Sequence, residues 1–355
     1  MRVGHGSLAV VAALSLTLGA SAQDWPSFRG PGAQGIADGQ NLPADWDVKT
    51  GRGVRWTAVI PGVGHSSPIV WGDRVFVTTA VPAEAPTIVL GDPKSEWGHG
   101  SSPVIFEDLA IVQVDKHADS FLAAFDLASG KPAWRIARDE RPVWATPTLY
   151  SSSGRAELVV VGGYHVRGYD PRSGKELWSF KDEAEVKTPT PFASDGLVIF
   201  AGGYRGRPLF AIRAGASGDV SVPGDAKTGP FLAWRSEPGG PYTTTPLAYR
   251  DLVYAVRDEG VLGVHDLRTG ILVYRERTGT THSASPVASD GRVYLAGEDG
   301  QLLVLRAGRA FEVLARIDMG ETVFATPAIS RGTMYVRTRG HLYAISAAGQ
   351  AAAGR

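Results

Sequence analysis

The chain has 355 residues, in which 36 Lys and Arg balance 36 Asp and Glu, and it contains no cysteine. The neutral balance argues against a nucleic-acid partner, because proteins that bind nucleic acids usually carry a basic surplus. A sequence without cysteine excludes disulfides, thiol nucleophiles, cysteine-ligated zinc, iron–sulfur clusters and the lipid anchor of a lipoprotein.

The first 22 residues predict a secretory signal peptide. Arg2 provides the positive start, Leu8–Leu18 is an apolar run, and residues 20–22 (Ala-Ser-Ala) form a cleavage site of the A-x-A type. The run is shorter than the about 20 apolar residues that cross a bilayer. We therefore expect cleavage after Ala22, no membrane span, no lipid anchor, and a periplasmic or secreted mature protein.

A repeat organises the rest of the chain. A Ser/Thr-Pro pair that opens a short apolar run recurs at steps of 35, 44, 44, 55, 40 and 41 residues. Proline fits the first residue of a strand, where its missing N–H costs little. Polar turns such as Asp195-Gly196 and Asp290-Gly291 come next, and Asp-Gly favours a tight hairpin. The seven prolines are Pro68, Pro103, Pro147, Pro191, Pro246, Pro286 and Pro327.

A second phrase is predicted between the third and fourth strands of a unit. It starts at an Asp, has Gly four residues later, and ends on an aromatic residue in the fourth strand. The three copies run over residues 126–134, 170–178 and, more weakly, 266–274. Trp56 and Trp234 fit the same aromatic slot.

Four short strands in each unit of about 40–45 residues are typical of a β-propeller blade. We expect an all-β fold with seven blades, of which the first is short because Ala80–Leu90 replaces most of two strands. An eight-bladed type of ring with one blade missing is the alternative. The last unit stops after its third strand, His341–Ser346, so we expect Val54–Ile60 to complete it and cover its open edge.

The predicted domain organisation follows from the repeat. Residues 1–22 are the signal peptide, 23–52 an N-terminal extended segment, 53–349 the propeller, and 350–355 a disordered tail.

The Asp/Tyr-x-x-x-Ser/Thr-Gly-Lys-x-x-Trp phrase resembles the repeat of pyrroloquinoline quinone (PQQ) propellers. That family includes quinoprotein alcohol dehydrogenases and an outer-membrane assembly lipoprotein. Residues 24–31 (Asp-Trp-Pro-Ser-Phe-Arg-Gly-Pro) and 97–103 (Trp-Gly-His-Gly-Ser-Ser-Pro) are similar to exported PQQ-like repeat proteins. The resemblance covers nearly all of residues 24–346 and is specific for the fold rather than for a function.

Resemblance to the dehydrogenases implies PQQ held over a calcium ion, against a disulfide of adjacent cysteines, with an Asp as base. The sequence has no cysteine, and no carboxylate and asparagine set can be assigned to calcium. We therefore expect no catalytic residue, no metal and no cofactor, and we keep a PQQ-dependent oxidoreductase as the alternative.

Candidate ligand-binding residues precede the blade-opening prolines by three or four positions, around the expected channel mouth. They are His65, His99, Trp144, Lys187, Tyr242, His282 and Phe324. Converging imidazoles could bind a metal. We favour the interpretation that each histidine caps a strand end or bonds a backbone carbonyl, because the sequence has no short ligand spacing.

Two glycine clusters, 162–167 and 202–207, occupy matching places in adjacent units. They are typical of tight turns. The second interpretation is a polar rim for an anionic or peptide ligand. The rim residues are Tyr164, Arg167, Tyr204 and Arg205.

Two further stretches are interpreted as surface loops. Asp115, His117 and Asp119 alternate after a strand but lack the Gly and distal Glu of a calcium loop, so they predict a solvated loop. The insertion Gly215–Gly229, which explains the 55-residue step, predicts a mobile surface loop.

Two functions from different classes fit the sequence. The first is a non-catalytic scaffold of the cell envelope that binds a protein or peptide, as the resemblance to the assembly lipoprotein implies. The second is a propeller that binds a quinone or another small molecule at its channel mouth.

Overall fold

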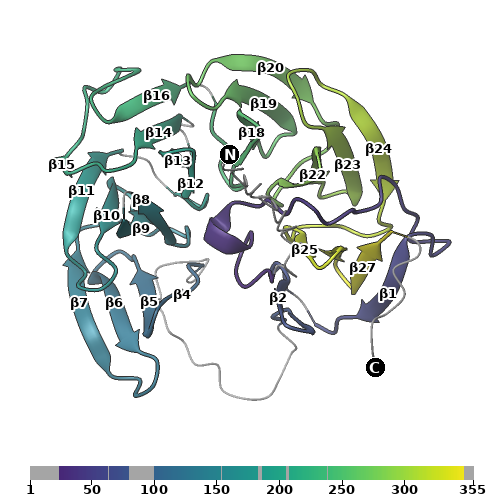
Figure 1. The fold of residues 1–355 in the computed structure, drawn as a ribbon, viewed down its shortest axis with the longest axis horizontal. Helices are drawn as coiled ribbons and strands as arrows, with labels where there is room; N and C mark the ends of the chain where they lie inside the picture. The colour runs from purple at the N-terminus through teal and green to yellow at the C-terminus, as the bar shows by residue number, and fades with distance from the viewer. Residues whose placement is uncertain are drawn as a thin grey trace, which may run out of the picture.

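The computed structural model describes residues 24–62, 64–79, 100–152, 154–182, 186–204, 208–237 and 239–347. These residues form β-sheets set around a ring, with one 3-10 turn, η1 (Pro31–Ala33), in its middle (Figure 1). The predicted all-β class is confirmed. The predicted signal peptide, the C-terminal tail and the stretch Ala80–Leu90 lie outside the described residues.

The described strands form seven sheets, of which one has only two strands. That sheet is β2 (Ile69–Trp71) with β3 (Arg74–Phe76). The others are β4 (Val104–Phe106), β5 (Leu109–Val114), β6 (Ser120–Asp126), β7 (Pro132–Arg138); β8 (Thr148–Ser152), β9 (Arg155–Val161), β10 (His165–Tyr169), β11 (Glu176–Lys181), β15 (Gly218–Asp219); β12 (Phe192–Ser194), β13 (Leu197–Ala201), β14 (Leu209–Arg213), β16 (Leu232–Ser236); β17 (Leu247–Tyr249), β18 (Leu252–Val256), β19 (Val261–Asp266), β20 (Leu272–Arg277); β21 (Val287–Ser289), β22 (Arg292–Ala296), β23 (Gln301–Arg306), β24 (Val313–Asp318); and β25 (Ala328–Ser330), β26 (Thr333–Arg337), β27 (His341–Ser346) with β1 (Val54–Val59).

The two ends of the propeller close one sheet. Strand β1 pairs antiparallel with β27, with Val59 opposite His341, so the sheet order is β1-β27-β26-β25. The prediction that the early strand completes the last unit is confirmed. The number of blades stays a prediction, because residues 80–99 between β3 and β4 lie outside the described part of the chain.

The Asp-Gly pairs occupy the tight turns that the repeat predicts. Asp195 and Gly196 have φ of 48° and 75°, and Asp290 and Gly291 have φ of 48° and 78°. Two consecutive positive φ angles define the turn that matches the twist of a hairpin.

Tryptophans of the fourth strands pack on glycines of the next sheet. Trp234 Nε1 donates to the Leu267 carbonyl at 2.8 Å, and a Cβ on Gly270 would lie 2.6 Å from its ring. Trp134 packs on Gly174 in the same way. Trp178 instead donates to the Glu157 carboxylate at 2.8 Å. The shared slot in the fourth strand is confirmed, but the contacts of its members differ.

The insertion at 215–229 is largely exposed, as a surface loop should be, but its first residues pack against a neighbouring sheet. Its strand β15 pairs with β11, with Gly218 opposite Trp178. Ala216 and Val220 are buried in the same hydrophobic cluster as Trp178. The free energy gained by burying these two side chains offsets part of the conformational entropy that the longer connection loses on folding.

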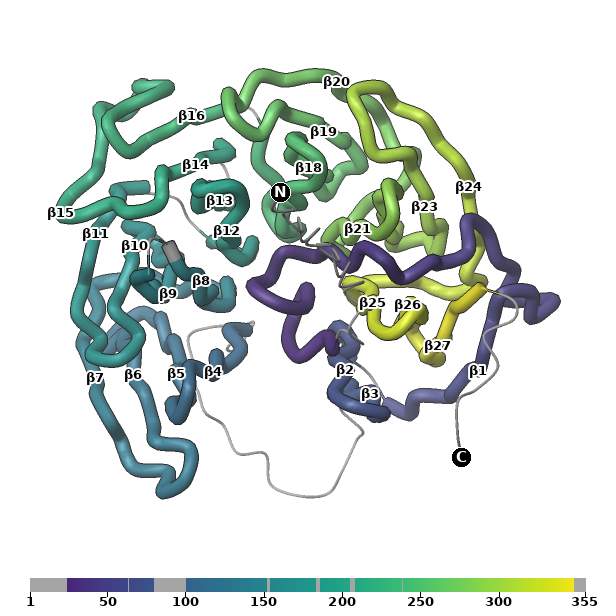
Figure 2. Tube along the Cα trace, viewed as in Figure 1, coloured from purple at the N-terminus to yellow at the C-terminus, as the bar shows by residue number. Residues whose placement is uncertain are grey.

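We call residues 24–52 the N-terminal strap, because this segment crosses the middle of the ring (Figure 2). The backbone of Trp25 exchanges hydrogen bonds with Val70 of β2, at 2.9 and 2.8 Å. Arg29 donates to the Pro246 carbonyl at 2.7 Å, and the Ala37 N–H donates to Ala288 of β21 at 2.9 Å. The strap therefore ties together sheets that are distant in sequence.

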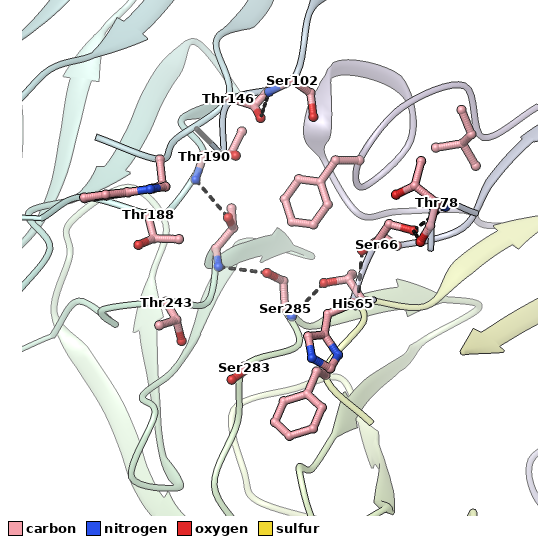
Figure 3. Close-up of a pocket in the computed structure, with 18 of the residues that line it drawn as sticks. His65, Ser66, Thr78, Ser102, Thr146, Thr188, Thr190, Thr243, Ser283 and Ser285 are labelled. Carbon is pink, nitrogen blue, oxygen red and sulfur yellow. Dashed lines mark hydrogen bonds between the residues drawn. The ribbon is translucent and has the colours of Figure 1, made fainter. Parts of the chain in front are cut away.

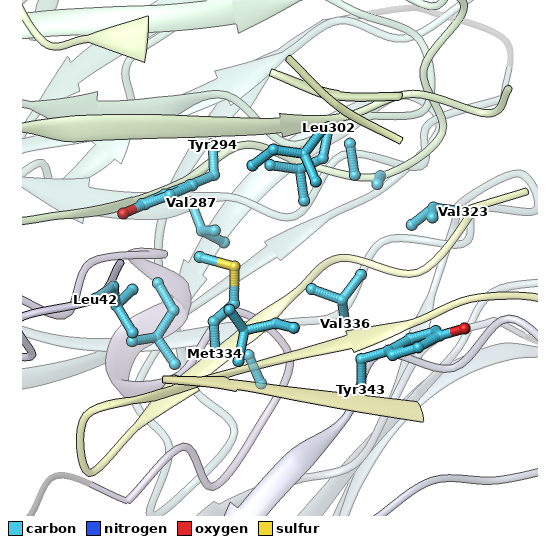
Figure 4. Packing of buried hydrophobic residues seen from close by; sticks show 14 of the residues in the cluster. Leu42, Val287, Tyr294, Leu302, Val323, Met334, Val336 and Tyr343 are labelled. Carbon is cyan, nitrogen blue, oxygen red and sulfur yellow. The ribbon is translucent and has the colours of Figure 1, made fainter. Parts of the chain in front are cut away.

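The strap also adds to the largest hydrophobic cluster, which lies between the β21–β24 and β25–β27 sheets. Figure 4 shows Leu42 of the strap beside Met334 of β26 and Val287 of β21. Trp46 is 2% exposed, and its Nε1 donates to Met319. Burial of such aromatic side chains contributes about 1.5–3 kcal/mol each to stability.

Replacing Asp290 by asparagine should loosen the strap. Burial opposes the charge of Asp290, but the backbone N–H groups of Gly39 and Asn41, at 2.6 and 2.7 Å, lower its pKa. A lowered pKa means that these bonds stabilise the fold above pH 3.8 and are lost as the pH falls through the folded-state value. We expect Asp290→Asn to cost about 1 kcal/mol at neutral pH and to reduce the acid sensitivity of the strap.

Limited proteolysis of the strap at pH 7 and pH 3 measures both effects. Asp73→Asn is the matched control, because the Asp73 side chain is 95% exposed. Equal cleavage of the two variants at pH 7 would contradict the capping role of Asp290.

Candidate functional site

A cavity of ≈ 580 Å³ lies at the centre of the ring and is lined by twenty residues. Twelve of them are Ser or Thr, and the only titratable side chain among them is His65, so the wall is polar but nearly uncharged. Figure 3 shows these hydroxyl groups around the cavity. They are Ser66, Ser67, Thr78, Ser102, Thr146, Thr188, Thr190, Thr243, Thr245, Ser283, Ser285 and Thr326.

The residue before each blade-opening proline supplies one member of a ring of hydroxyl groups. We call this set the hydroxyl ring: Ser67, Ser102, Thr146, Thr190, Thr245, Ser285 and Thr326. Its members are linked from one sheet to the next. Thr190 N–H donates to the Thr245 hydroxyl and Thr245 N–H to that of Ser285, both at 2.9 Å. Thr326 N–H donates to Ser67 at 3.1 Å, from the last sheet to the first.

Three of the predicted mouth residues line the cavity. They are His65, Trp144 and Phe324. The rings of His65 and Phe324 lie 4.7 Å apart. His99 lies outside the described residues.

Lys187, Tyr242 and His282 do not line the cavity, although their neighbours Thr188, Thr243 and Ser283 do. Alternation along an extended segment turns successive side chains to opposite sides, which explains the difference. The Lys187 ammonium lies 3.0 Å from the Asp182 carboxylate. The Tyr242 ring packs on Tyr204, with ring centres 5.2 Å apart.

His282 is buried and has a structural role. Its Nδ1 lies 2.9 Å from the Ala296 carbonyl and its Nε2 2.9 Å from the Thr278 hydroxyl. Burial lowers the pKa of His282, which keeps the imidazole neutral. Both ring nitrogens are therefore occupied, and His282 cannot join His65 as a metal ligand. Within the described chain, no group of three or more His, Asp or Glu could hold a metal ion.

The glycine cluster at 162–167 makes room for a buried carboxylate. A Cβ on Gly162 would lie 2.3 Å from Cδ of Glu140. The Tyr164 N–H donates to Glu140 at 2.6 Å, and the Arg167 guanidinium pairs with the same carboxylate and with Glu176. The charge of Arg167 is thus balanced within the protein, which weakens its interpretation as an anion-binding rim residue.

The matching rim position in the next unit is only partly described. Tyr204 is 40% exposed, and Arg205 lies outside the described residues. The Tyr204 ring contacts the ring of Tyr242, which directly precedes the cavity-lining Thr243. Neither tyrosine lines the cavity itself.

Asp115 is buried rather than solvated, so the predicted solvated loop is wrong at this residue. Its carboxylate pairs with Arg138 at 2.8 Å, and the two side chains are 0% and 1% exposed. His117 and Asp119 are exposed, as predicted. The missed signal is the Arg at the end of the fourth strand, whose position beside Asp115 only the folded sheet reveals.

The family model described as outer membrane protein assembly factor BamB matches residues 32–270 and 164–351. No curated protein matches the sequence. The crystal structure of BamB from Moraxella catarrhalis is similar, with 13% identity, a TM-score of 0.52, and coverage of 69% of this chain and 71% of that chain.

A second similar structure is the quinohemoprotein alcohol dehydrogenase from Comamonas testosteroni. It has 12% identity and a TM-score of 0.65, and the match covers 94% of this chain and 82% of that chain. At such identities the likeness shows the propeller fold alone. Because the family match extends over most of the sequence, this chain belongs to the PQQ-like repeat family whose model is described as outer membrane protein assembly factor BamB.

Proposed function

We propose that the protein is an exported, non-catalytic propeller that binds a protein or peptide partner in the cell envelope. Family membership supports a scaffold of the envelope. The signal peptide removed after Ala22 and the absence of a lipid-bearing cysteine belong to the same proposal. No helix of the described residues is long and apolar enough to cross a membrane.

The observation that carries the proposal is an apolar groove between β2 and β4. Trp71 and Ile105, which are 63% and 55% exposed, line a cavity of ≈ 660 Å³ together with Pro26 and Pro31 of the strap. Contiguous exposed apolar patches mark interaction sites or ligand-binding grooves. Phe76 of β3, on the same two-stranded sheet as Trp71, is 47% exposed but lines the central cavity rather than the groove.

The backbone beside this groove offers hydrogen bonds to an extended partner. In the described residues, β3 pairs with β2 and with no other strand. Among the described residues the outer edge of β3 therefore has no strand partner, and a peptide in extended conformation can pair with its N–H and C=O groups. The apolar groove and the open edge together fit a partner segment with alternating apolar side chains.

A dehydrogenase of the PQQ type fits the central cavity poorly. The calcium ion and the base of such a site need carboxylates, and none of the twenty residues that line the cavity is Asp or Glu. The sequence also lacks the two adjacent cysteines of those enzymes. The residues present therefore do not fit the group, and we derive no catalytic step from it.

Replacing Trp71 by lysine should abolish capture of the partner. A photo-crosslinking amino acid introduced at position 105 in envelope-exported protein should give one discrete adduct, identified by mass spectrometry. We expect Trp71→Lys to reduce its yield at least tenfold, because loss of a buried aromatic anchor commonly costs about 2 kcal/mol or more.

Ile271→Lys is the matched control, since Ile271 is 67% exposed on a turn far from the groove. Equal loss of the adduct in both variants would count against a specific groove.

The alternative function, a quinone-binding propeller or PQQ-dependent oxidoreductase, rests on the size of the central cavity, which suits a small molecule. Reconstitution with PQQ, calcium and simple alcohols tests it. Dye reduction above the control without PQQ would replace the scaffold proposal.

A further inference from the structure

The hydroxyl ring presents hydrogen-bond donors to the central cavity. Five of its seven oxygens already accept a backbone N–H from the neighbouring sheet. A hydroxyl that accepts one bond keeps its own proton for donation. Among the described residues, no member of the ring donates this proton to a protein acceptor.

Thr190 is, with Ser102, one of the two ring members whose hydroxyl accepts no backbone N–H. Its N–H donates to Thr245, but its hydroxyl makes no hydrogen bond with the described protein, although the residue is only 3% exposed. Its side chain lines the cavity. The ring therefore lacks acceptors rather than donors, and a ligand that completes it must bring oxygen acceptors.

Two buried arginines without carboxylate partners flank this ring. Arg29 of the strap is 0% exposed and donates only to the carbonyls of Pro246, directly after Thr245, and of Gln34. Burial lowers its pKa to about 9, so it stays cationic at neutral pH. Nε of Arg29 is buried without a partner.

Arg337 is 2% exposed and approaches the cavity from β26. Its Nη1 donates to the hydroxyl of Ser66 at 2.6 Å and to the carbonyl of Thr78 at 2.8 Å, and both residues line the cavity. Its Nε is also buried without a partner. Among the described residues neither Arg337 nor Arg29 forms an ion pair, and burial is the one cause that lowers the pKa of each guanidinium, so neither positive charge is balanced by a described carboxylate.

Two carboxylates lie behind residues that line the central cavity. Asp258 accepts the Thr243 N–H at 3.0 Å, and Glu298 accepts the hydroxyls of Ser283 and Thr281. Thr243 and Ser283 precede the ring members by two positions. The negative charges of these two carboxylates repel an anion near Thr243 and Ser283, although neither carboxylate lines the cavity.

We propose that the hydroxyl ring binds a small oxyanion, of the phosphate, sulfate or carboxylate class, through its O–H donors. The anion balances the charges of Arg29 and Arg337 through the low-dielectric interior. Hydrogen bonds from several hydroxyl groups to an anion are stronger than bonds between neutral partners. The central cavity adjoins the groove between β2 and β4, and Ser102, Thr146 and Thr190 line both. The two proposals are still tested separately, because Trp71 lines the groove alone.

Isothermal titration calorimetry of the purified exported chain tests the proposal, with inorganic phosphate, sulfate and citrate as probes at constant ionic strength. We expect saturable binding of at least one probe in a one-to-one ratio. Thr190→Val keeps the shape of the residue and breaks no protein hydrogen bond, so the fold should persist. We expect it to weaken binding about tenfold, because one bond to a charged group is lost.

Two other variants test whether the bound ligand is negatively charged and whether the loss of binding is specific to the hydroxyl ring. Glu298→Gln removes a negative charge and should tighten binding about two- to threefold. Thr57→Val, on the exposed face of β1, should leave binding unchanged. The proposal is overturned by no saturable binding of any probe, by unchanged binding in Thr190→Val, or by weaker binding in Glu298→Gln.

Discussion

Replacing Asp115 by alanine should lower the free energy of unfolding by about 3–5 kcal/mol, because it strands a buried guanidinium. Asp115 binds Arg138 through two bonds, Nε to Oδ1 at 2.8 Å and Nη2 to Oδ2 at 3.0 Å. Burial opposes the charge of Arg138, but the Asp115 carboxylate raises its pKa, so the guanidinium stays protonated. Gln113 and Tyr169 complete the cluster.

Urea denaturation followed by tryptophan fluorescence measures this loss. Asp139→Ala is the control, because Asp139 is the exposed neighbour of Arg138 and should change stability by less than about 0.5 kcal/mol. The double variant Asp115→Ala, Arg138→Met removes both charges and should recover most of the stability. A single Asp115→Ala variant as stable as the wild type would show that the guanidinium reaches water.

Replacing Gly270 by alanine should destabilise the fold by about 2–5 kcal/mol. Gly270 has a φ of 69°, which costs an L-residue about 1–2 kcal/mol. A Cβ there would also lie 2.6 Å from Trp234, and overpacking of a core typically adds about 1–3 kcal/mol. The Trp234 ring cannot withdraw, since it is 2% exposed and its Nε1 is bonded to Leu267.

Gly130 provides a matched control within the same repeat phrase. It has the same φ of 69°, but a Cβ there would meet nothing within 4 Å. Gly130→Ala should therefore cost only the backbone strain, about 1–2 kcal/mol. The difference between the two variants in urea denaturation isolates the contact between tryptophan and glycine. Equal losses would mean that the packing of Trp234 on Gly270 is dispensable.

The architecture was predictable because its signals are local and repeated. Pro286 before β21 and the Asp290-Gly291 turn after it mark one strand and one hairpin without reference to the rest of the fold. The closure of the last sheet by β1 followed from counting strands in each unit. Such features depend on neighbours in the sequence, which the sequence shows directly.

The candidate site was harder to predict because it depends on contacts between sheets. His65 and His282 precede their prolines at similar distances, yet one lines the cavity and the other is buried against the Ala296 carbonyl. The hydroxyl of Thr245 was part of a visible motif. Its role became clear only when the N–H of Thr190, 55 positions away, was found to donate to it.

The pairing of β1 with β27 has a consequence for the order in which the molecule is assembled. Because a chain is synthesised from its N-terminus, β1 cannot pair with β27 until His341–Ser346 has been made. Contacts of such large sequence separation form slowly, and the waiting edge of β1 is exposed to wrong partners. We therefore expect the ring to close as a late step of folding, once both ends of the chain are present.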